Sequence, residues 1–236
     1  MSSPFHIAID GPVAAGKGTV SRLVADRLGY LYVDTGAMYR VTAFLAKNNS
    51  VDWSNESQIV ELITKTTIEM HNPLENEKDG RLTTVLLNGE DVSWQIRTEE
   101  ISKGASIVAA HPEVRKVLVG KQKIIAQNQN VVMEGRDITY AVLPQANLKI
   151  YLTAGDTVRA KRRHTQLLTK GQDLTFEEVY TQLLKRDQLD MGRQADPLKI
   201  IPDAWVIDSG DLSIEQVVEL IEARVKVMRG EYETKS

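Results

Sequence analysis

Five short apolar runs divide the chain at intervals. They cover Phe5–Asp10, Tyr30–Asp34, Val131–Glu134, Leu148–Leu152 and Ala204–Asp208. Their residues are mostly apolar rather than alternately apolar and polar, which is typical of strands buried on both faces of a parallel sheet. Because helical patterns separate the runs, we expect an α/β core in which helices cover both faces of a parallel five-stranded sheet.

Two amphipathic helices are indicated by apolar residues at helical spacing. Their stripes consist of Val20, Leu23, Val24 and Leu28, and of Ile214, Val217, Val218, Ile221, Val225 and Met228. Ser213 and Gln216 form the pattern of a capping box at the start of the last helix. Thr175 and Glu178 form the same pattern, which predicts a helix through about Leu189.

Residues 51–97 interrupt the alternation of strands and helices. A helical segment at residues 54–64 is followed by a β-rich segment at 66–70 and by a polar segment with Pro and Gly at 71–80. Two further β-rich segments follow at 81–88 and 91–96. Asn88-Gly89 is a turn signal between the last two segments. The pattern predicts a small antiparallel β meander inserted into the α/β core. Such an insert is either structural decoration or an acceptor-binding domain, and we favour the second.

A glycine-spaced loop follows directly on the first apolar run. It reads Gly11-Pro12-Val13-Ala14-Ala15-Gly16-Lys17-Gly18-Thr19. Such a loop presents successive backbone N–H groups around a concavity, and the helix N-terminus adds partial positive charge, so the loop suits a polyphosphate. Lys17 can reach the outer phosphates. Glycine–lysine pairs also occur in ordinary loops, but the preceding strand and the following helix favour nucleotide binding.

The hydroxyl residue of this P-loop is displaced by one position. Ser or Thr usually follows the lysine, whereas here Gly18 follows it and the hydroxyl arrives at Thr19. This Gly-Lys-Gly-Thr variant resembles the loop of nucleoside monophosphate kinases. We therefore expect Thr19 to lie near Mg²⁺, directly or through water.

Charged residues follow two other runs. The second run ends at Asp34-Thr35 and leads into a helix that carries Arg40, and the third ends in the segment Glu134-Gly135-Arg136-Asp137. Ligands of a doubly wound sheet lie beyond the carboxyl ends of its strands. Each of these residues alone is more typical of a surface ion pair or a turn. Their position one strand away from the P-loop favours a phosphate-binding role.

The second half of the chain adds two charged segments. Arg186, Asp190 and Arg193 have the spacing of one helix face, which is either an exposed ladder of ion pairs or a wall of the site. Gly192 weakens the helix there by roughly 1 kcal/mol, so we expect Arg193 in a loosened last turn. The basic residues 159–164 precede the polar segment 169–173, and together they suggest a solvated face or a lid.

Composition limits the class of protein. The chain has 236 residues, a net charge of −3 and no cysteine. The charge does not indicate attraction to nucleic acid or to an anionic membrane, and the absence of cysteine excludes disulfides and thiolate ligands. No apolar stretch reaches membrane-spanning length. We expect a soluble, cytoplasmic, monomeric enzyme that binds small-molecule nucleotides.

Taken together, these segments resemble the bacterial cytidylate kinases, P-loop enzymes that phosphorylate CMP and dCMP. The likeness extends from the P-loop to about Asp208 and is carried by IDGPVAAGKGT, DTGAMYR, IRTEEISKGASIVAAHPEVR, EGRDI, RAKRRHTQL and RDQLDMGRQADPL. The resemblance implies a P-loop kinase core over residues 1–50 and 98–236, an insert at 51–97 that binds the nucleoside monophosphate, and an arginine-rich lid at about 156–173. It also implies ATP as donor and Mg²⁺ as cofactor.

The resemblance also implies roles for single residues. ATP would contact residues 11–19 together with Arg162 and Arg163 of the lid. The acceptor would contact Thr35, Arg40, Arg136 and Arg186 through its phosphate, Arg193 through a phosphate or the sugar, Asp190 through the ribose, and Ser106, Arg115 and Asp137 through the base. The catalytic residues would be Lys17, Arg136, Arg159 and Arg186. No protein nucleophile is needed, because the ionised acceptor phosphate can attack in line.

The implied base-reading residues match cytosine chemically. Cytosine offers a donor amine at C4 and an acceptor at N3, so a carboxylate beside an arginine or a hydroxyl suits it. Uracil reverses both groups and would place an oxygen against Asp137. Buried polar groups without partners are costly, so we expect UMP to be the poorer substrate.

The chain departs from the family pattern at three places. Val13-Ala14 replaces the more usual Ser-Gly, Thr139-Tyr140 stands where Gly-Thr is common, and residues 155–158 differ from a Ser- and Glu-rich start. The second departure bears on the geometry beside Asp137. None of the three changes a charge that the reaction needs.

Three alternatives stay open on the sequence. A kinase of this class could use UMP or another small acceptor. A regulatory module would hydrolyse ATP slowly and gain nothing from an acceptor. The basic residues 159–164 could bind RNA, which the net charge of −3 disfavours.

Overall fold

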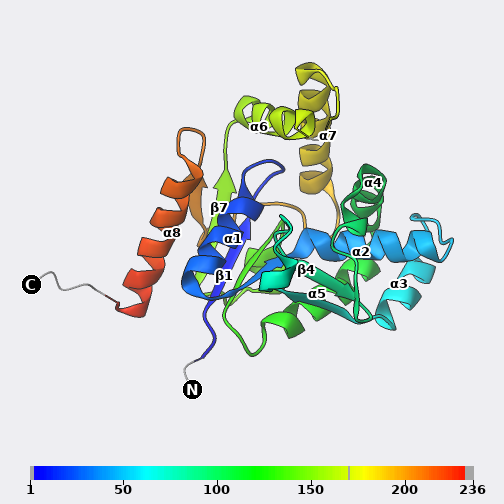
Figure 1. Ribbon diagram of the computed structural model, residues 1–236, viewed down its shortest axis with the longest axis horizontal. Coiled ribbons are helices and arrows are strands. Elements are labelled where there is room, and N and C mark those ends of the chain that lie inside the picture. The colour runs from blue at the N-terminus through cyan, green and yellow to red at the C-terminus, as the bar shows by residue number, and fades with distance from the viewer. Residues whose placement is uncertain (1–2, 170, 232–236) are drawn as a thin grey trace, which may run out of the picture.

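A parallel five-stranded sheet forms the centre of the computed structural model, which describes residues 3–169 and 171–231. Its strands are β1 (His6–Asp10), β2 (Leu31–Asp34), β6 (Val131–Gly135), β7 (Leu148–Thr153) and β8 (Trp205–Asp208), in the spatial order β2-β6-β1-β7-β8 (Figure 1). Each strand begins and ends within one residue of its predicted run, which confirms the parallel core. All five carboxyl ends therefore lie at one edge of the sheet.

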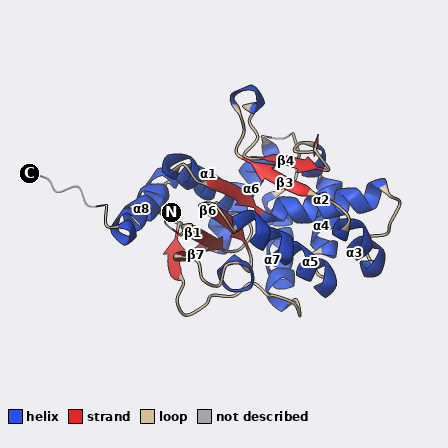
Figure 2. Ribbon diagram, turned by 90° about the horizontal axis from the view of Figure 1, so that it is seen from below, coloured by secondary structure: helices blue, strands red, loops and turns tan. Residues whose placement is uncertain are grey.

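Helices cover both faces of this sheet, as predicted (Figure 2). The helices α1 (Lys17–Leu28) and α8 (Ile214–Arg229) pack on the face to which Ile7 and Ile9 point. The other face, to which Ala8 points, is covered by α2 (Thr35–Asn48), α4 (Glu99–Val108) and α5 (Pro112–Ala126). Successive residues of β1 thus enter two separate cores, which is why the strands lack polar alternation.

The predicted stripe of α8 is confirmed at its centre and wrong at its ends. Val217, Val218, Ile221 and Val225 are fully buried. Ile214 and Met228 are 49% and 42% exposed, because the helix extends beyond the sheet that it covers. The capping box is confirmed, with the Ser213 hydroxyl accepting a hydrogen bond from the Gln216 N–H at 3.1 Å.

The insert contains the predicted antiparallel meander. After α3 (Glu56–Thr64), strands β3 (Ile68–His71), β4 (Thr84–Leu87) and β5 (Glu90–Asp91) form a three-stranded sheet, with 3₁₀ turns η1 (Glu75–Glu77) and η2 (Gln95–Arg97) beside it. Asn88 and Gly89 have φ of 52° and 86°, as expected of a tight hairpin turn.

The strand expected over 91–96 is wrong beyond its first residue. The Asp91 carboxylate accepts hydrogen bonds from the N–H and the hydroxyl of Ser93, at 2.9 and 2.6 Å. This side-chain turn bends the backbone away from β4, and the chain continues into η2 instead.

A helical hairpin lies beyond the carboxyl end of β7 (Figure 1). It consists of α6 (Asp156–Leu168) and α7 (Phe176–Gly192), and the predicted capping box of Thr175 and Glu178 starts α7. The helix continues to Gly192 rather than ending near Leu189. Arg193 follows in extended backbone, with φ −66° and ψ 146°, so it does not continue the helical face of Arg186 and Asp190. Among the described residues, none of the helices is both long and apolar enough to span a bilayer.

Candidate active site

The P-loop connects β1 to α1 at the carboxyl edge of the sheet. Gly11 is required by close packing, because a Cβ there would lie 2.0 Å from the carbonyl oxygen of Leu152. The ammonium of Lys17 donates to the Pro12 carbonyl at 2.9 Å and lies 4.0 Å from the Glu134 carboxylate. Burial, followed by the charge of Arg136, lowers the pKa of Lys17 to about 7. The lysine is therefore held inside the loop, poised to regain full charge beside an anion.

The first turn of α1 directs Gly18, and not Thr19, toward the carboxylates. A Cβ built on Gly18 would lie 3.4 Å from both the Glu134 carboxylate and the Tyr32 hydroxyl. Thr19 is exposed, since the next residue of a helix is turned by about 100°. Glu134 was not among the predicted ligands, although it lies opposite Asp34 in the β2–β6 pairing. Burial raises the pKa of Glu134. Glu134 thus faces the first turn of α1, and Asp34 lies next to it on β2.

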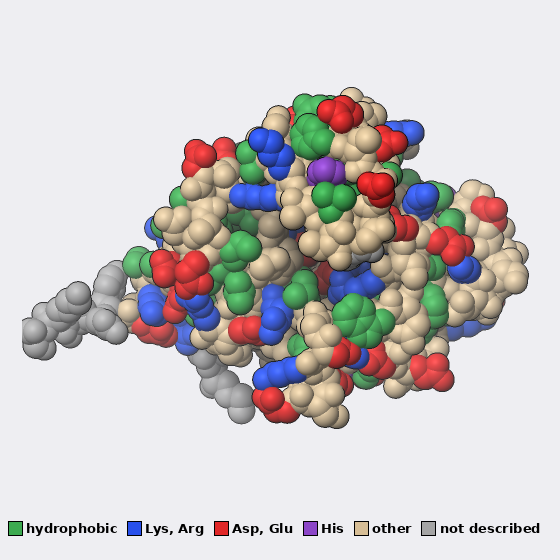
Figure 3. All heavy atoms as spheres, turned by 45° about the horizontal axis from the view of Figure 1, so that its top comes forward, with side chains coloured by type: hydrophobic (Ala, Val, Ile, Leu, Met, Phe, Trp, Pro, Cys, Tyr) green, Lys and Arg blue, Asp and Glu red, His purple; other side chains and the backbone are tan. Residues whose placement is uncertain are grey.

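Predicted phosphate-binding residues converge next to this loop. The Arg40 guanidinium lies 2.5 Å from Asp34 Oδ2, and Arg136 Nε donates to Asp190 Oδ2 at 2.7 Å. The Thr35 hydroxyl donates to the backbone carbonyl of Glu134 at 2.8 Å. In the space-filling view, Lys and Arg side chains gather in a hollow below the α6–α7 hairpin (Figure 3).

Arg186 differs from the other arginines of this group. Among residues 3–169 and 171–231, its guanidinium forms no hydrogen bond and no ion pair. Burial, followed by the positive charge of Arg136 and then those of Arg40 and Arg163, lowers the pKa of Arg186 to about 10. It is still cationic at neutral pH, surrounded by like charges. Such crowding favours a bound anion.

Two of the three predicted base-reading residues are in contact. Arg115 is 1% exposed and pairs with Asp137, and its Nε also lies 3.1 Å from Asp196 Oδ2. Arg193 Nη2 lies 3.4 Å from the other oxygen of Asp137. Ser106 is not part of this group, because its side chain is exposed and donates to the Ser102 carbonyl of its own helix.

Tyr39 joins this group and was missed by the sequence analysis. The guanidinium carbon of Arg115 lies 5.4 Å from the centre of the Tyr39 ring, within cation–π range. The Tyr39 hydroxyl is buried and has no hydrogen-bond partner among the described residues. The position of Tyr39 inside the DTGAMYR motif could have indicated a role in the site. A tyrosine at this position of an amphipathic helix is equally suitable for the hydrophobic core, so the sequence did not distinguish the two roles.

Asp10, at the end of β1, stabilises the turn that follows Asp137. Its carboxylate accepts the N–H groups of Ile138 and Thr139, each at 2.9 Å, and the Thr139 hydroxyl at 2.6 Å. These bonds hold the π-helical turn η3 (Ile138–Val142), which starts directly after Asp137. Burial raises the pKa of Asp10 to about 6 in spite of the three donors.

The departure Thr139-Tyr140 therefore has a defined structural role. Thr139 supplies one of the bonds to Asp10, and the Tyr140 hydroxyl donates to the Pro197 carbonyl at 2.5 Å. The second contact fixes the segment that carries Asp196, the partner of Arg115. Both residues thus tie the turn after Asp137 to its surroundings.

Of the three arginines in the predicted lid, Arg159 contacts the P-loop and Arg162 contacts Ser209, which itself donates to the Ala15 carbonyl of the loop. Arg159 is buried, donates to the Val13 carbonyl at 2.9 Å and pairs with Asp187 at 2.7 Å. Arg162 donates to the Ser209 hydroxyl and carbonyl at 3.0 and 2.6 Å. Arg163 instead contacts Gln166 and Glu99 on the exposed side of α6.

Comparison with known proteins identifies the family of this chain. The family model described as cytidylate kinase matches residues 7–227. Proteins named cytidylate kinase are similar over nearly their whole length: one from Geobacillus sp. (strain WCH70) is 45% identical over 221 residues, covering 94% of this chain and 96% of that protein. One from Shouchella clausii (strain KSM-K16) is 42% identical over 226 residues, covering 96% and 98%.

Solved structures are more distant. The crystal structure of TT1252 from Thermus thermophilus has 20% identity and a TM-score of 0.46, and covers 96% of this chain and 98% of that one. That similarity is too low to support an argument. The family model and the relatives above 40% identity are sufficient by themselves. The chain belongs to the cytidylate kinase family.

Proposed function

We propose that this chain transfers the γ-phosphoryl group of MgATP to the 5′-phosphate of CMP or dCMP, giving ADP and CDP or dCDP. One observation carries the proposal: Asp137, paired with buried Arg115, lies at the same sheet edge as the P-loop, one residue from Arg136. The Arg115–Asp137 pair, which suits cytosine, and the P-loop, which suits a polyphosphate, therefore lie at the same edge. Arg136 lies between them and suits the acceptor phosphate. We propose residues 51–97 as the insert that closes over this acceptor.

The reaction needs charge neutralisation more than it needs a nucleophile. The acceptor phosphate is ionised and attacks in line, so the protein supplies positioning and positive charge. Lys17 and the P-loop amides would hold the donor phosphates. Arg40, Arg136 and Arg186 would surround the acceptor phosphate, with the Thr35 hydroxyl beside them. Among the described residues, Arg186 forms no direct ion pair with a carboxylate, and Asp190 only partly offsets the neighbouring cations, so its guanidinium can bind the transferring group.

The donor set beside the P-loop suits a magnesium ion. Glu134 would supply a carboxylate oxygen beside Lys17 and Gly18, and oxygen is what Mg²⁺ prefers. The neighbouring Asp34 carboxylate is engaged by Arg40 and by the Ala37 N–H. Thr19 stays a predicted ligand, directly or through water, although its side chain is exposed. When bound, Mg²⁺ neutralises the charge of the donor phosphates.

The remaining contacts would set specificity and exclude water. Asp137 would accept from the C4 amine of cytosine while Arg115 donates to N3, and Asp190 would accept from the ribose. Ser106 remains a proposed base contact, which requires its helix to turn toward the ligand. Arg159 and Arg162 of α6 would cover ATP, and Arg163 would join them only if α6 moves. Exclusion of water prevents hydrolysis of the donor.

A substrate panel tests the proposal. ADP formation is measured with CMP, dCMP, UMP and AMP as acceptors, in wild type and in Asp137→Asn, with Asp203→Asn as a control for a surface aspartate. We expect wild type to prefer CMP or dCMP. The substitution should lower kcat/KM for CMP about 100-fold and that for UMP less than fivefold, because only cytosine presents a donor to that carboxylate. An unchanged ratio of CMP to UMP would refute the base-reading role, and ADP formation that is independent of any acceptor would refute the kinase.

A further inference from the structure

Ala14, in the middle of the P-loop, has a backbone conformation that suits glycine. Its φ is 58°, which lies in the left-handed region. The other non-glycine residues with positive φ among those described are Ser50, Asn88 and Asp196, whose short polar side chains can form local hydrogen bonds. The methyl group of alanine offers no such compensation. Backbone strain of this kind persists only where the surrounding structure imposes it, so we looked for contacts that hold the neighbouring peptide groups.

Both backbone polar groups of Val13, the residue before Ala14, are bound by one buried ion pair. The Val13 N–H donates to Asp187 Oδ1 at 3.3 Å, and the Val13 carbonyl accepts from Arg159 Nη1 at 2.9 Å. The same Nη1 lies 2.7 Å from Asp187 Oδ2. The Arg159 and Asp187 side chains are 3% and 5% exposed. We call these two residues the Val13 clamp; one belongs to α6 and the other to α7.

The clamp acts on the peptide group that determines the conformation of Ala14. The Val13 carbonyl belongs to the peptide group between Val13 and Ala14, so the direction of this carbonyl is coupled to φ of Ala14. The Pro12 carbonyl is bound as well, by the ammonium of Lys17 at 2.9 Å. A left-handed residue within a turn lets successive N–H groups face one concavity, which is the arrangement that binds phosphate. The strained conformation at Ala14 is therefore part of the phosphate-binding form of the loop.

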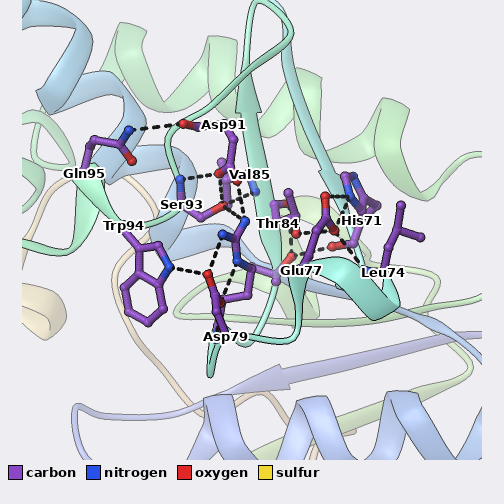
Figure 4. Close-up of polar contacts among 12 residues, drawn as sticks. His71, Leu74, Glu77, Asp79, Thr84, Val85, Asp91, Ser93, Trp94 and Gln95 are labelled. Carbon is purple, nitrogen blue, oxygen red and sulfur yellow. Dashed lines mark hydrogen bonds and ion pairs between the residues drawn. The ribbon is translucent and has the colours of Figure 1, made fainter.

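The Val13 clamp differs from the arginine network of the insert. There Arg81 pairs with Asp79 and with Asp91, and the Trp94 indole donates to Asp79 at 2.8 Å (Figure 4). The two carboxylates of that network are 42% and 43% exposed, and its bonds stay within the insert. It therefore stabilises local turns. A buried ion pair adds little net stability, because both charges lose their hydration, so orientation of the P-loop backbone explains the clamp better than stability does.

We propose that Asp187 is a positioning residue for the phosphoryl donor. Together with Arg159 it holds Ala14 in the left-handed conformation and so directs the P-loop amides toward the phosphates of ATP. The proposal rests on the proposed function, because it concerns the donor of the same reaction, and it assigns no contact between Asp187 and a ligand. One consequence is that displacement of α7 would release Val13 and allow Ala14 to relax, which would weaken donor binding.

A substitution of the clamp tests whether it arranges the donor site. Asp187→Asn retains the size of the side chain and removes the ion pair with Arg159. We expect it to raise the KM for MgATP about tenfold while the KM for CMP changes less than twofold. A tenfold loss corresponds to about 1.4 kcal/mol, which is within the range of strain at a left-handed alanine. Asp203→Asn, whose carboxylate pairs with Lys149 away from the loop, should change neither constant.

A second substitution tests the cause of the loss. Glycine adopts positive φ without steric cost, so Ala14→Gly alone should keep the KM for MgATP within twofold of wild type. The double variant Asp187→Asn with Ala14→Gly should return this KM to within threefold of wild type. The dissociation constant of ATP, measured by calorimetry without an acceptor, should follow the same order. Asp187→Glu displaces the carboxylate but keeps its charge, and it should show a smaller loss with the same rescue even if Asp187→Asn does not fold.

Any of three results would overturn the proposal. An unchanged KM for MgATP in both Asp187 variants would show that the clamp does not arrange the loop. An equal rise in the KM for CMP would show that Asp187 only supports the fold. A loss that Ala14→Gly does not restore would show that strain at Ala14 is not the cause. If wild type uses another donor better than ATP, the proposed function fails separately, and the same rescue measured with that donor still decides the role of Asp187.

Discussion

The ammonium group of Lys17 lies 2.9 Å from the Pro12 carbonyl oxygen, and only 5% of the side chain is exposed. A cation in this position is costly unless an anion compensates it, and its pKa is lowered accordingly. The donor phosphates of the proposed reaction provide that compensation. The same residue thus destabilises the folded chain and stabilises the transition state, in which charge on the donor phosphates is redistributed.

We expect Lys17→Met to remove nearly all phosphoryl transfer. Methionine retains the apolar stem and removes the costly buried charge, so the variant should fold and be at least as stable as wild type, while kcat falls by a factor of about 1000 because the cation at the donor phosphates is lost. Lys149→Met is the matched control, since Lys149 is also largely buried but pairs with Asp203 away from the site. Steady-state assays and thermal unfolding of both variants decide the matter. Turnover near that of wild type in Lys17→Met would contradict the phosphate role.

Secondary-structure elements whose signals are local were predictable from the sequence. Apolar runs located the strands, and the glycines of residues 11–18 located the P-loop. Contacts between distant elements were not predictable: Asp10 supports the turn at Ile138, which is 128 residues away, and no local pattern connects them. The register of the Gly18-Thr19 pair on α1 was missed for a similar reason, because it depends on which side of the helix faces β6.

The turn η3 gives a prediction about pH. Burial raises the pKa of Asp10 from 3.8 to about 6, so between these values the folded chain binds more protons than the unfolded chain. The contribution of this group to stability is therefore full below about pH 4 and is lost as pH rises to about 6. Asp10→Asn imitates the protonated form and cannot titrate. Urea unfolding at pH 4.5, 5.5 and 7 should show the stability advantage of wild type over Asp10→Asn shrinking by about 2 kcal/mol across this range. A difference that is constant with pH would show that Asp10 titrates normally.

At the scale of the whole molecule, the two cores leave one edge of the sheet for charged residues. Elements from every part of the chain bring cations there: Lys17 from α1, Arg40 from α2, Arg97 from the insert, Arg136 after β6, and Arg186 from α7. The Asp34 carboxylate pairs with Arg40, and the Asp190 carboxylate pairs with Arg136. Arg186 forms no ion pair among the described residues, so Arg136 and Arg40 repel its guanidinium with only the more distant charge of Asp190 to offset them.

Removing the charge of Arg186 should therefore stabilise the chain while it damages the activity. Arg186→Met keeps the apolar stem and removes a cation whose pKa is lowered by burial and by Arg136. We expect the free energy of unfolding in chloride buffer to rise by about 1 kcal/mol, which is less than the shift alone implies because the site is partly solvated. We also expect kcat and the affinity for CMP both to fall at least tenfold. Lys185→Met, at an exposed position of the same helix, should change neither the stability nor the affinity for CMP. If Arg186→Met were less stable than wild type and equally active, the Arg186 guanidinium would have a structural role. The acceptor phosphate would then be bound by the other cations at this edge of the sheet.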